Sequence, residues 1–349
     1  MKKPYFVDWA ITNRCNLNCP HCTGMMAEEL TTAEAERLID DIGQLGPGWV
    51  LVEGGEPLLR PDLFKLLGRI RGHGLELYLI SNGMILNEQA VSSLRELGVK
   101  LLLSVDGTDK QTYEEIKFGA SWEQLLESAR LAREAGILHG MTVVLSRRNK
   151  NQVEGFLSLA STMGMKAIIF IGLQPAAGSI TLTQASLLQH KALAPEEYEE
   201  CIYRVRRAME GSSLSIFFDE PFWGPVVSEL GCSGGGSDLN TGIVVTEERG
   251  CIMGEWIYIQ TNGDVRPCMF APDELTYGNV RQTSLSRIWE KMQQDELLRG
   301  LKQRSRRHGS CARCPHFEGC GGCPVRIFGA EGDWFGSDPA CPLGARALA

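Results

Sequence analysis

The feature that most constrains the fold is an alternation of short apolar runs with longer amphipathic runs, from residue 5 to about residue 172. The short runs are rich in β-branched and aliphatic residues, which is typical of strands, and the longer runs have the apolar spacing of helices. We expect strands at residues 5–11, 49–54, 75–82, 100–107, 138–146 and 166–173. We expect helices between them at residues 31–46, 62–74, 87–98, 122–136 and 152–164, which end at glycine as helices commonly do.

Strands and helices that alternate in this way predict a parallel sheet with right-handed crossovers. Because six units are fewer than a closed barrel of about eight requires, we expect an α/β fold with a partial (β/α)6 TIM-like barrel. A small Cys-rich domain follows it. The predicted division is a barrel at residues 1–190, a bridging region with a helix, a strand and a Gly-rich loop at residues 191–250, and the Cys-rich domain at residues 251–349.

Three cysteines, Cys15, Cys19 and Cys22, follow the first expected strand as C-x-x-x-C-x-x-C. A structural zinc site takes four ligands, and disulfides use cysteines in pairs. Three thiols therefore favour a metal centre that is left open on one side, and part of a zinc site is the alternative. A further thiol, Cys201, lies in an expected amphipathic helix, where a buried structural role is favoured.

Small and polar residues end or directly follow the next three expected strands, at the edge where ligands collect in such folds. Glycines let a backbone approach a ligand closely, and a carboxylate can accept bonds from an amino group or a ribose diol. Taken singly, each of these motifs also fits an ordinary turn. The residues are Gly54, Gly55, Glu56 and Pro57, then Asn82, then Ser104 and Asp106. We expect them to converge on one mouth with the three cysteines.

Together and in this order, the motifs resemble those of the radical S-adenosylmethionine (SAM) family over roughly residues 5–175. The resemblance implies that Cys15, Cys19 and Cys22 hold a 4Fe–4S cluster whose open iron binds SAM. It also implies radical chemistry: one electron from the reduced cluster cleaves SAM, and the 5′-deoxyadenosyl radical removes hydrogen from a substrate. The implied partners are that substrate and a one-electron reductant such as ferredoxin or flavodoxin.

The same resemblance gives roles to the polar residues at the mouth. It implies that Gly54, Gly55 and Glu56 receive the methionine amino group of SAM, and that Asn82 lies at the same mouth. Ser104 and Asp106 would lie near the ribose. We expect His21 to pack under the adenine or the cluster. Lys117 stands where relatives often have arginine.

The C-terminal cysteines follow the pattern C-x11-G-x4-C, C-x2-C-x5-C-x2-C, then C. This pattern resembles the SPASM extension of radical SAM enzymes, although the usual third gap is three residues. The resemblance implies one or two auxiliary 4Fe–4S clusters, the first held by Cys311, Cys314, Cys320 and Cys341 and the second by Cys251, Cys268 and Cys323. Cys232 or an open iron would complete the second cluster. The alternative of a zinc ribbon is disfavoured, because ribbon pairs lie a dozen or more residues apart.

Composition narrows the class of substrate and the compartment. The net charge of −8 argues against a nucleic-acid partner, and no apolar run of about 20 residues predicts a membrane span. Without a signal peptide, the twelve cysteines indicate a reducing compartment, and we expect the cytoplasm. Since the first strand begins near residue 5, we expect no fused leader-peptide-binding domain.

The sequence leaves the identity of the substrate undecided. SPASM proteins often modify ribosomally made peptides or proteins, which is the interpretation we favour. The alternative is modification of a tetrapyrrole, such as a heme or heme d1 precursor, or maturation of a metallocofactor, which the tail "CGGCPVRIFGAEGDWFGSDPACP" resembles. A multi-cluster iron–sulfur electron carrier is an alternative of another class.

Overall fold

The six expected strands are present, and they lie side by side in chain order with parallel pairing. The computed structural model describes residues 2–22, 27–174, 191–229 and 250–346, so Cys232 lies outside the described residues. The strands are β1 (Val7–Thr12), β2 (Trp49–Gly54), β3 (Glu76–Ser81), β4 (Lys100–Ser104), β5 (Leu138–Leu145) and β6 (Ala167–Gly172). The predicted partial barrel is therefore confirmed.

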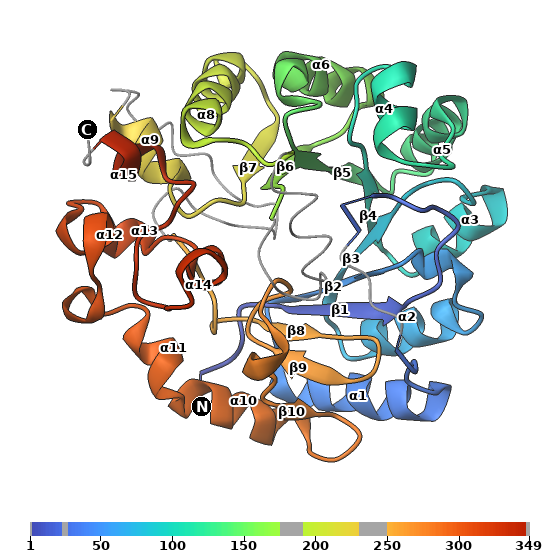
Figure 1. Ribbon diagram of the computed structural model, residues 1–349. Helices are drawn as coiled ribbons and strands as arrows, with labels where there is room; N and C mark the ends of the chain where they lie inside the picture. Colours follow the sequence, from blue (N-terminus) through green and yellow to red (C-terminus); the bar gives the residue numbers. More distant parts are fainter. Residues whose placement is uncertain (1, 23–26, 175–190, 230–249, 347–349) are drawn as a thin grey trace.

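The helices of the barrel cover the outer face of the curved sheet (Figure 1). They are α1 (Thr32–Leu45), α2 (Leu63–Gly72), α3 (Glu88–Glu96), α4 (Lys110–Ile116), α5 (Trp122–Glu134), α6 (Val153–Met163) and α8 (Pro195–Met209). Helix α1 starts with a capping box between Thr31 and Glu34, and it ends at Gly46 in the left-handed conformation. Helix α4 was not expected from the sequence.

Two further strands extend the sheet at its edges. β7 (Ser215–Phe218) pairs in parallel with β6, and β8 (Ile257–Ile259) pairs in parallel with β1. β8 then turns back into β9 (Asp264–Arg266) at Asn262-Gly263, a residue pair typical of hairpin turns. β10 (Gly278–Asn279) pairs with β9. Among the described strands, β7 and β8 end the parallel series without pairing with each other, so the ring is open.

The C-terminal segment occupies the open side of the ring (Figure 1). Its helices are short: α9 (Trp223–Glu229), α10 (Leu285–Gln294), α11 (Glu296–Gly300), α12 (Gly309–Arg313), α13 (Phe317–Cys320), α14 (Pro324–Glu331) and α15 (Pro342–Arg346). Helix α10 is joined to the barrel because the Leu285 amide donates to Asp41 and the Trp289 indole donates to the carbonyl of Lys2. The C-terminal segment is thus tied to the N-terminal strand and helix.

A stack of aromatic rings closes the inside of the barrel at the amino ends of the strands. The Phe6 ring stacks on Trp49 at 4.1 Å and on Trp256 at 4.7 Å between centroids, and Tyr78 meets Trp49 edge to face at 5.5 Å. Large rings fill space efficiently and exclude water. Access to the interior is therefore from the carboxyl ends of the strands, where the predicted site residues lie.

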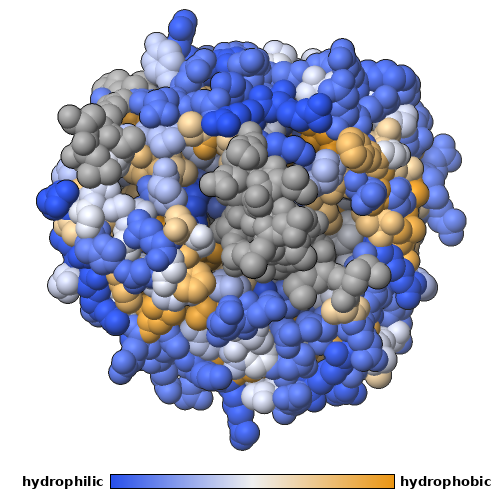
Figure 2. All heavy atoms as spheres, viewed as in Figure 1, coloured by the Kyte–Doolittle hydropathy of each residue, from blue (hydrophilic) through white to orange (hydrophobic). Residues whose placement is uncertain are grey.

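The surface in the view of Figure 2 is mostly hydrophilic, with hydrophobic residues gathered in separate patches. Within the described residues, no helix is both long enough and apolar enough to span a bilayer.

Candidate active site at the mouth of the barrel

The turn after β2 rests directly on the segment that carries the first three cysteines. The Gly55 amide donates to the Thr12 carbonyl, and the Glu56 amide donates to the Arg14 carbonyl, both at 2.7 Å. A Cβ at Gly54 would lie 2.5 Å from the Thr12 oxygen, and a Cβ at Gly55 would lie 2.2 Å from the Arg14 oxygen. These glycines are therefore required for backbone to pack on backbone, and their close approach is to the cysteine segment itself.

The Glu56 carboxylate ties the end of β2 to the end of β3. It is 0% exposed, and it accepts hydrogen bonds from the Ser81 hydroxyl (2.9 Å), the Asn82 amide (2.8 Å) and the Leu58 amide (3.2 Å). Burial raises the pKa of Glu56, although these hydrogen bonds oppose the rise. The neighbouring Pro57 is buried and begins a 3₁₀ turn. Glu56 thus holds the turns after β2 and β3 together at the mouth.

The end of β3 contacts the cysteine segment through Asn82. Its side-chain amide lies 3.9 Å from the Cys15 sulfur, and the Leu17 amide donates to the same sulfur at 3.4 Å. The Cys22 amide donates to the Cys19 carbonyl at 3.1 Å, which curls the segment into a turn. Hydrogen bonds to sulfur are typical of iron–sulfur ligation, so this thiol set fits such a cluster.

Ser104, which ends β4, and Asp106, which follows the strand, are both contacted by Lys117. The buried Asp106 carboxylate accepts from the Val144 amide at 2.7 Å and lies 3.2 Å from Lys117 Nζ and 3.5 Å from His21 Nε2. Lys117 also donates to the Ser104 hydroxyl at 2.7 Å. Burial acts to raise the pKa of Asp106, but Lys117 and His21 outweigh it and hold that pKa well below its usual range.

Lys117 is a site residue whose contacts the sequence did not predict. It caps the C-terminus of α4 and reaches back to the end of β4. His21, expected under the adenine or the cluster, lies against Asp106. Its ring nitrogen Nε2 contacts the Asp106 carboxylate, and packing under the adenine or the cluster stays a prediction. A basic residue at the end of the helix that follows a strand-end Asp is the signal that could have indicated this network.

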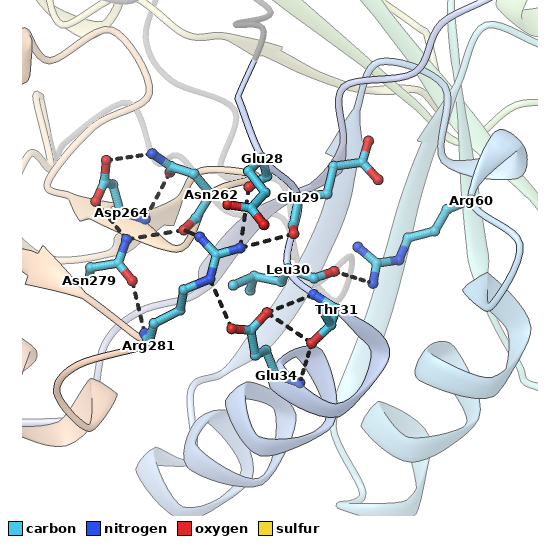
Figure 3. Close-up of polar contacts among 10 residues, drawn as sticks. All are labelled: Glu28, Glu29, Leu30, Thr31, Glu34, Arg60, Asn262, Asp264, Asn279 and Arg281. Atoms are coloured by element: carbon cyan, nitrogen blue, oxygen red, sulfur yellow. Dashed lines mark hydrogen bonds and ion pairs between the residues drawn. The ribbon is translucent and has the colours of Figure 1, made fainter.

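Two arginines brace the chain where it returns from the cysteine segment (Figure 3). Arg281, which follows β10, donates to the Glu29 carbonyl at 2.9 Å and to the Asn262 carbonyl at 2.8 Å. Arg60, which follows β2, donates to the Leu30 carbonyl at 2.9 Å. Backbone carbonyl groups of irregular segments thereby accept hydrogen bonds from charged side chains. Neither arginine was expected at the site, because each acts on the backbone of a segment distant in the sequence.

The C-terminal cysteines form two neighbouring groups. One cavity in the SPASM-like segment is lined by four thiols: Cys311, Cys314, Cys320 and Cys341. The other three lie near one another and act electrostatically on one another: Cys251, Cys268 and Cys323. The two sets predicted from the sequence are therefore each brought together. The Gly322 amide donates to the Cys320 sulfur at 3.4 Å, which again fits thiolate ligation of an iron–sulfur cluster.

A buried arginine connects this segment to the end of β7. Arg326 on α14 makes bonds of 2.7 Å to both carboxylate oxygens of Asp338, and of 3.2 and 2.9 Å to those of Glu220. Asp338 in turn accepts from the Cys323 amide at 2.8 Å. The barrel, the arginine and a predicted cluster ligand thus form one hydrogen-bonded series, which we call the Arg326 clamp.

Comparison with known families decides between a radical SAM enzyme, a zinc protein and an electron carrier. The profile described as "Radical SAM superfamily" matches residues 9–160, and the SPASM profile, described as "Iron-sulfur cluster-binding domain", matches residues 251–315. The chain therefore contains a radical SAM domain and a SPASM domain. This radical SAM/SPASM protein is an enzyme whose cofactors are a 4Fe–4S cluster with SAM, together with auxiliary iron–sulfur cluster binding in the SPASM domain.

The enzyme is similar to named proteins along almost its whole length. An AdoMet-dependent heme synthase of Methanosarcina barkeri is 28% identical over 97% of this chain and 96% of its own length. A mycofactocin maturase of Mycobacterium tuberculosis is 27% identical over 98% of this chain and 83% of its own length. The crystal structure of SuiB from Streptococcus suis has the same fold, with a TM-score of 0.75 and 18% identity over 97% of this chain and 77% of SuiB.

Proposed function

We propose that this radical SAM enzyme cleaves SAM to a 5′-deoxyadenosyl radical and abstracts hydrogen from a ribosomally made peptide or protein. The observation that carries the proposal is the convergence of the turns after β2 and β3 on the segment of Cys15, Cys19 and Cys22. When bound, the cluster and SAM supply the radical chemistry. The protein holds these groups in place and excludes water.

In this proposal, Cys15, Cys19 and Cys22 hold the cluster that binds SAM. Gly54 and Gly55 set the position of the cysteine segment, and support for this role comes from their contacts with Thr12 and Arg14. The methionine end of SAM lies beside Glu56, Pro57 and Asn82. The ribose lies beside Ser104 and Asp106, and Lys117 fixes the orientation of both side chains.

For the SPASM domain we propose two auxiliary clusters. The cavity of four thiols supports the first, with ligands Cys311, Cys314, Cys320 and Cys341. The second takes Cys251, Cys268 and Cys323. The proposed functional division keeps the radical SAM barrel at residues 1–190, a bridging region at residues 191–250 and the SPASM domain at residues 251–349; the SPASM profile begins at residue 251, which supports the last boundary.

Named relatives support a peptide substrate. One is a mycofactocin maturase, and SuiB, whose fold is the same, was crystallised bound to the precursor peptide SuiA. We further propose that a ferredoxin or flavodoxin supplies the electron, and that the enzyme works in the cytoplasm, where its many thiols stay reduced.

A tetrapyrrole is the second candidate substrate. The observation that favours it is the match with an AdoMet-dependent heme synthase over 96% of that protein's length. A pre-heme d1 synthase of Dinoroseobacter shibae is also 28% identical over 98% of this chain.

The test of radical initiation is production of 5′-deoxyadenosine. The enzyme is purified without oxygen, loaded with iron and sulfide, reduced and mixed with SAM, and the product is measured by mass spectrometry. We expect product from the wild type and none from Cys22→Ala, because one iron of the cluster loses its thiolate. Cys201→Ala is the matched control, since Cys201 is a buried thiol of α8 outside the cysteine motifs. Equal product from Cys22→Ala would contradict the assignment.

A further inference from the structure

Three carboxylates face the interior of the barrel beneath the mouth. Asp8 lies on β1 and Glu53 on β2, and Asp219 follows β7. In the strand register, Asp8 is paired with Tyr258 of β8, and Glu53 is paired with Ala10, which is two residues after Asp8. Because side chains alternate between the faces of a strand, these residues share the inner face of the sheet. We call Asp8, Glu53 and Asp219 the acidic chamber.

The acidic chamber opens toward the cysteine segment. Glu53 and Tyr258 line a cavity that also includes Cys22, Gly54 and Gly55. On the other side, Asp219 acts electrostatically on Cys251 and Cys268, which are predicted ligands of an auxiliary cluster. The chamber therefore lies between the proposed SAM site and the SPASM cysteines.

The burial of Asp8 and its unpaired oxygen indicate a ligand. Its side chain is on the inner face and only 3% of it is exposed, yet its Oδ1 has no hydrogen-bond partner in the part of the chain that the structure describes. A buried, unsatisfied carboxylate oxygen is costly, and folded proteins rarely keep one without a reason. Glu53 is half-buried and Asp219 is accessible to solvent, so the chamber is lined by carboxylates that a ligand can reach.

One arginine, Arg266, lies beside Tyr258 at the acidic chamber, and it is paired with Asp273 and with the Ala271 carbonyl. The charged groups that act on Asp8 are Glu53 and Asp219, both carboxylates, and they add to burial in raising the pKa of Asp8. Burial likewise raises the pKa of Glu53 to about 7. Arg326, which attracts Asp219, is already committed to Glu220 and Asp338.

We propose that the acidic chamber binds a positively charged group of the substrate, an ammonium or guanidinium from a peptide side chain or amino terminus. The inference rests on the proposed function and names the chemistry of the substrate at that site. A cation would satisfy Asp8 and pair with Glu53 and Asp219. Tetrapyrrole precursors carry several carboxylates, which these side chains would repel, so the chamber favours the peptide over the tetrapyrrole.

The test uses small probes that carry one charge on the same alkyl chain. Binding of n-pentylamine and of pentanoate to the cluster-loaded enzyme with SAM is measured by calorimetry without oxygen. We expect the amine to bind and pentanoate not to bind. Glu53→Gln and Asp8→Asn should each weaken the binding of the amine about tenfold, which corresponds to about 1.4 kcal/mol. Glu127→Gln, on the exposed face of α5, is the matched control and should change nothing.

Amine binding that is absent, or that is equal in wild type, Glu53→Gln and Asp8→Asn, would overturn the proposal. So would binding of pentanoate or of iron coproporphyrin III with an affinity equal to that of the amine. If Asp8→Asn does not fold, Glu53→Gln alone decides, since Glu53 is half-buried at the end of its strand. The binding assay needs no turnover, so a failure to form 5′-deoxyadenosine would count against the proposed function and not against the chamber.

Discussion

At the scale of single residues, His139 is a neutral ring enclosed in the base of the barrel. It lies on β5, is 7% exposed and meets Tyr78 edge to face at 5.4 Å. Burial, together with the charges of Lys100 and Lys166, lowers the pKa of His139 from 6.5 to about 4. The folded protein therefore resists protonation of this ring.

This shift predicts how stability depends on pH. As the pH falls below 6.5, His139 of the unfolded chain takes up a proton that the folded chain does not bind until the pH approaches 4. The free energy of unfolding should therefore drop by about 2 kcal/mol between roughly pH 7 and pH 5 through this residue alone. Urea unfolding at the two pH values measures the drop in the wild type and in His139→Gln. Equal drops in the two proteins would contradict the prediction.

At the scale of elements, the turn after β2 determines where the first cysteines lie. In Gly55→Ala the new Cβ would overlap the Arg14 carbonyl, so the cysteine segment must move away from the turn. We expect this variant to lose the iron of the SAM-binding cluster and to keep the iron of the SPASM domain. Iron content and the electron paramagnetic resonance signal of the reduced protein measure both.

Gly68→Ala is the control for the glycine substitution. A Cβ at Gly68, in the middle of α2, would meet its nearest atom at 3.6 Å, which is an ordinary contact. Alanine stabilises a helix interior by up to about 1 kcal/mol relative to glycine. This variant should therefore keep all its iron and unfold at a slightly higher temperature. Full iron in Gly55→Ala would show that the turn does not position the cysteines.

The strands and turns could be predicted from the sequence because their signals are local. β-branched runs indicated β1 to β6, and Asn262-Gly263 indicated the hairpin of β8 and β9. The partner of β8 could not be predicted, since a three-residue strand carries no sign that it pairs with β1. The spacing of the cysteines is also a local signal, and it indicated the candidate cluster ligands. The contacts of Lys117 and Arg281 could not be predicted, because they depend on how distant segments pack.

At the scale of the whole molecule, the Arg326 clamp joins the barrel to the SPASM domain. Arg326→Met would leave the buried carboxylates of Glu220 and Asp338 without their cation. Breaking a buried pair in this way typically costs about 3–5 kcal/mol. We expect a loss of stability in that range and a loss of auxiliary iron, because Asp338 also positions the Cys323 amide. Chemical unfolding and iron analysis measure the two effects.

The control for the clamp is Arg130→Met on the surface of α5. Arg130 pairs with Glu127 and Glu134, and all three side chains are largely exposed, so its loss should cost at most about 1 kcal/mol. A wild-type iron content in Arg326→Met would mean that the SPASM domain holds its clusters without support from the barrel.

The pairing of β1 with β8 also bears on how the chain is made. Ile257 leaves the ribosome about 235 residues after Cys22, which at typical synthesis rates means a delay of roughly ten to fifty seconds. Throughout that interval one edge of β1 has no neighbour, and the three thiols that follow it lack the bracing of Arg281. A nascent chain in this state presents an open strand edge and reactive sulfur together. Metal delivery and chaperone protection therefore have to act on a chain whose first strand gains its second neighbour only about 235 residues after Cys22 is made.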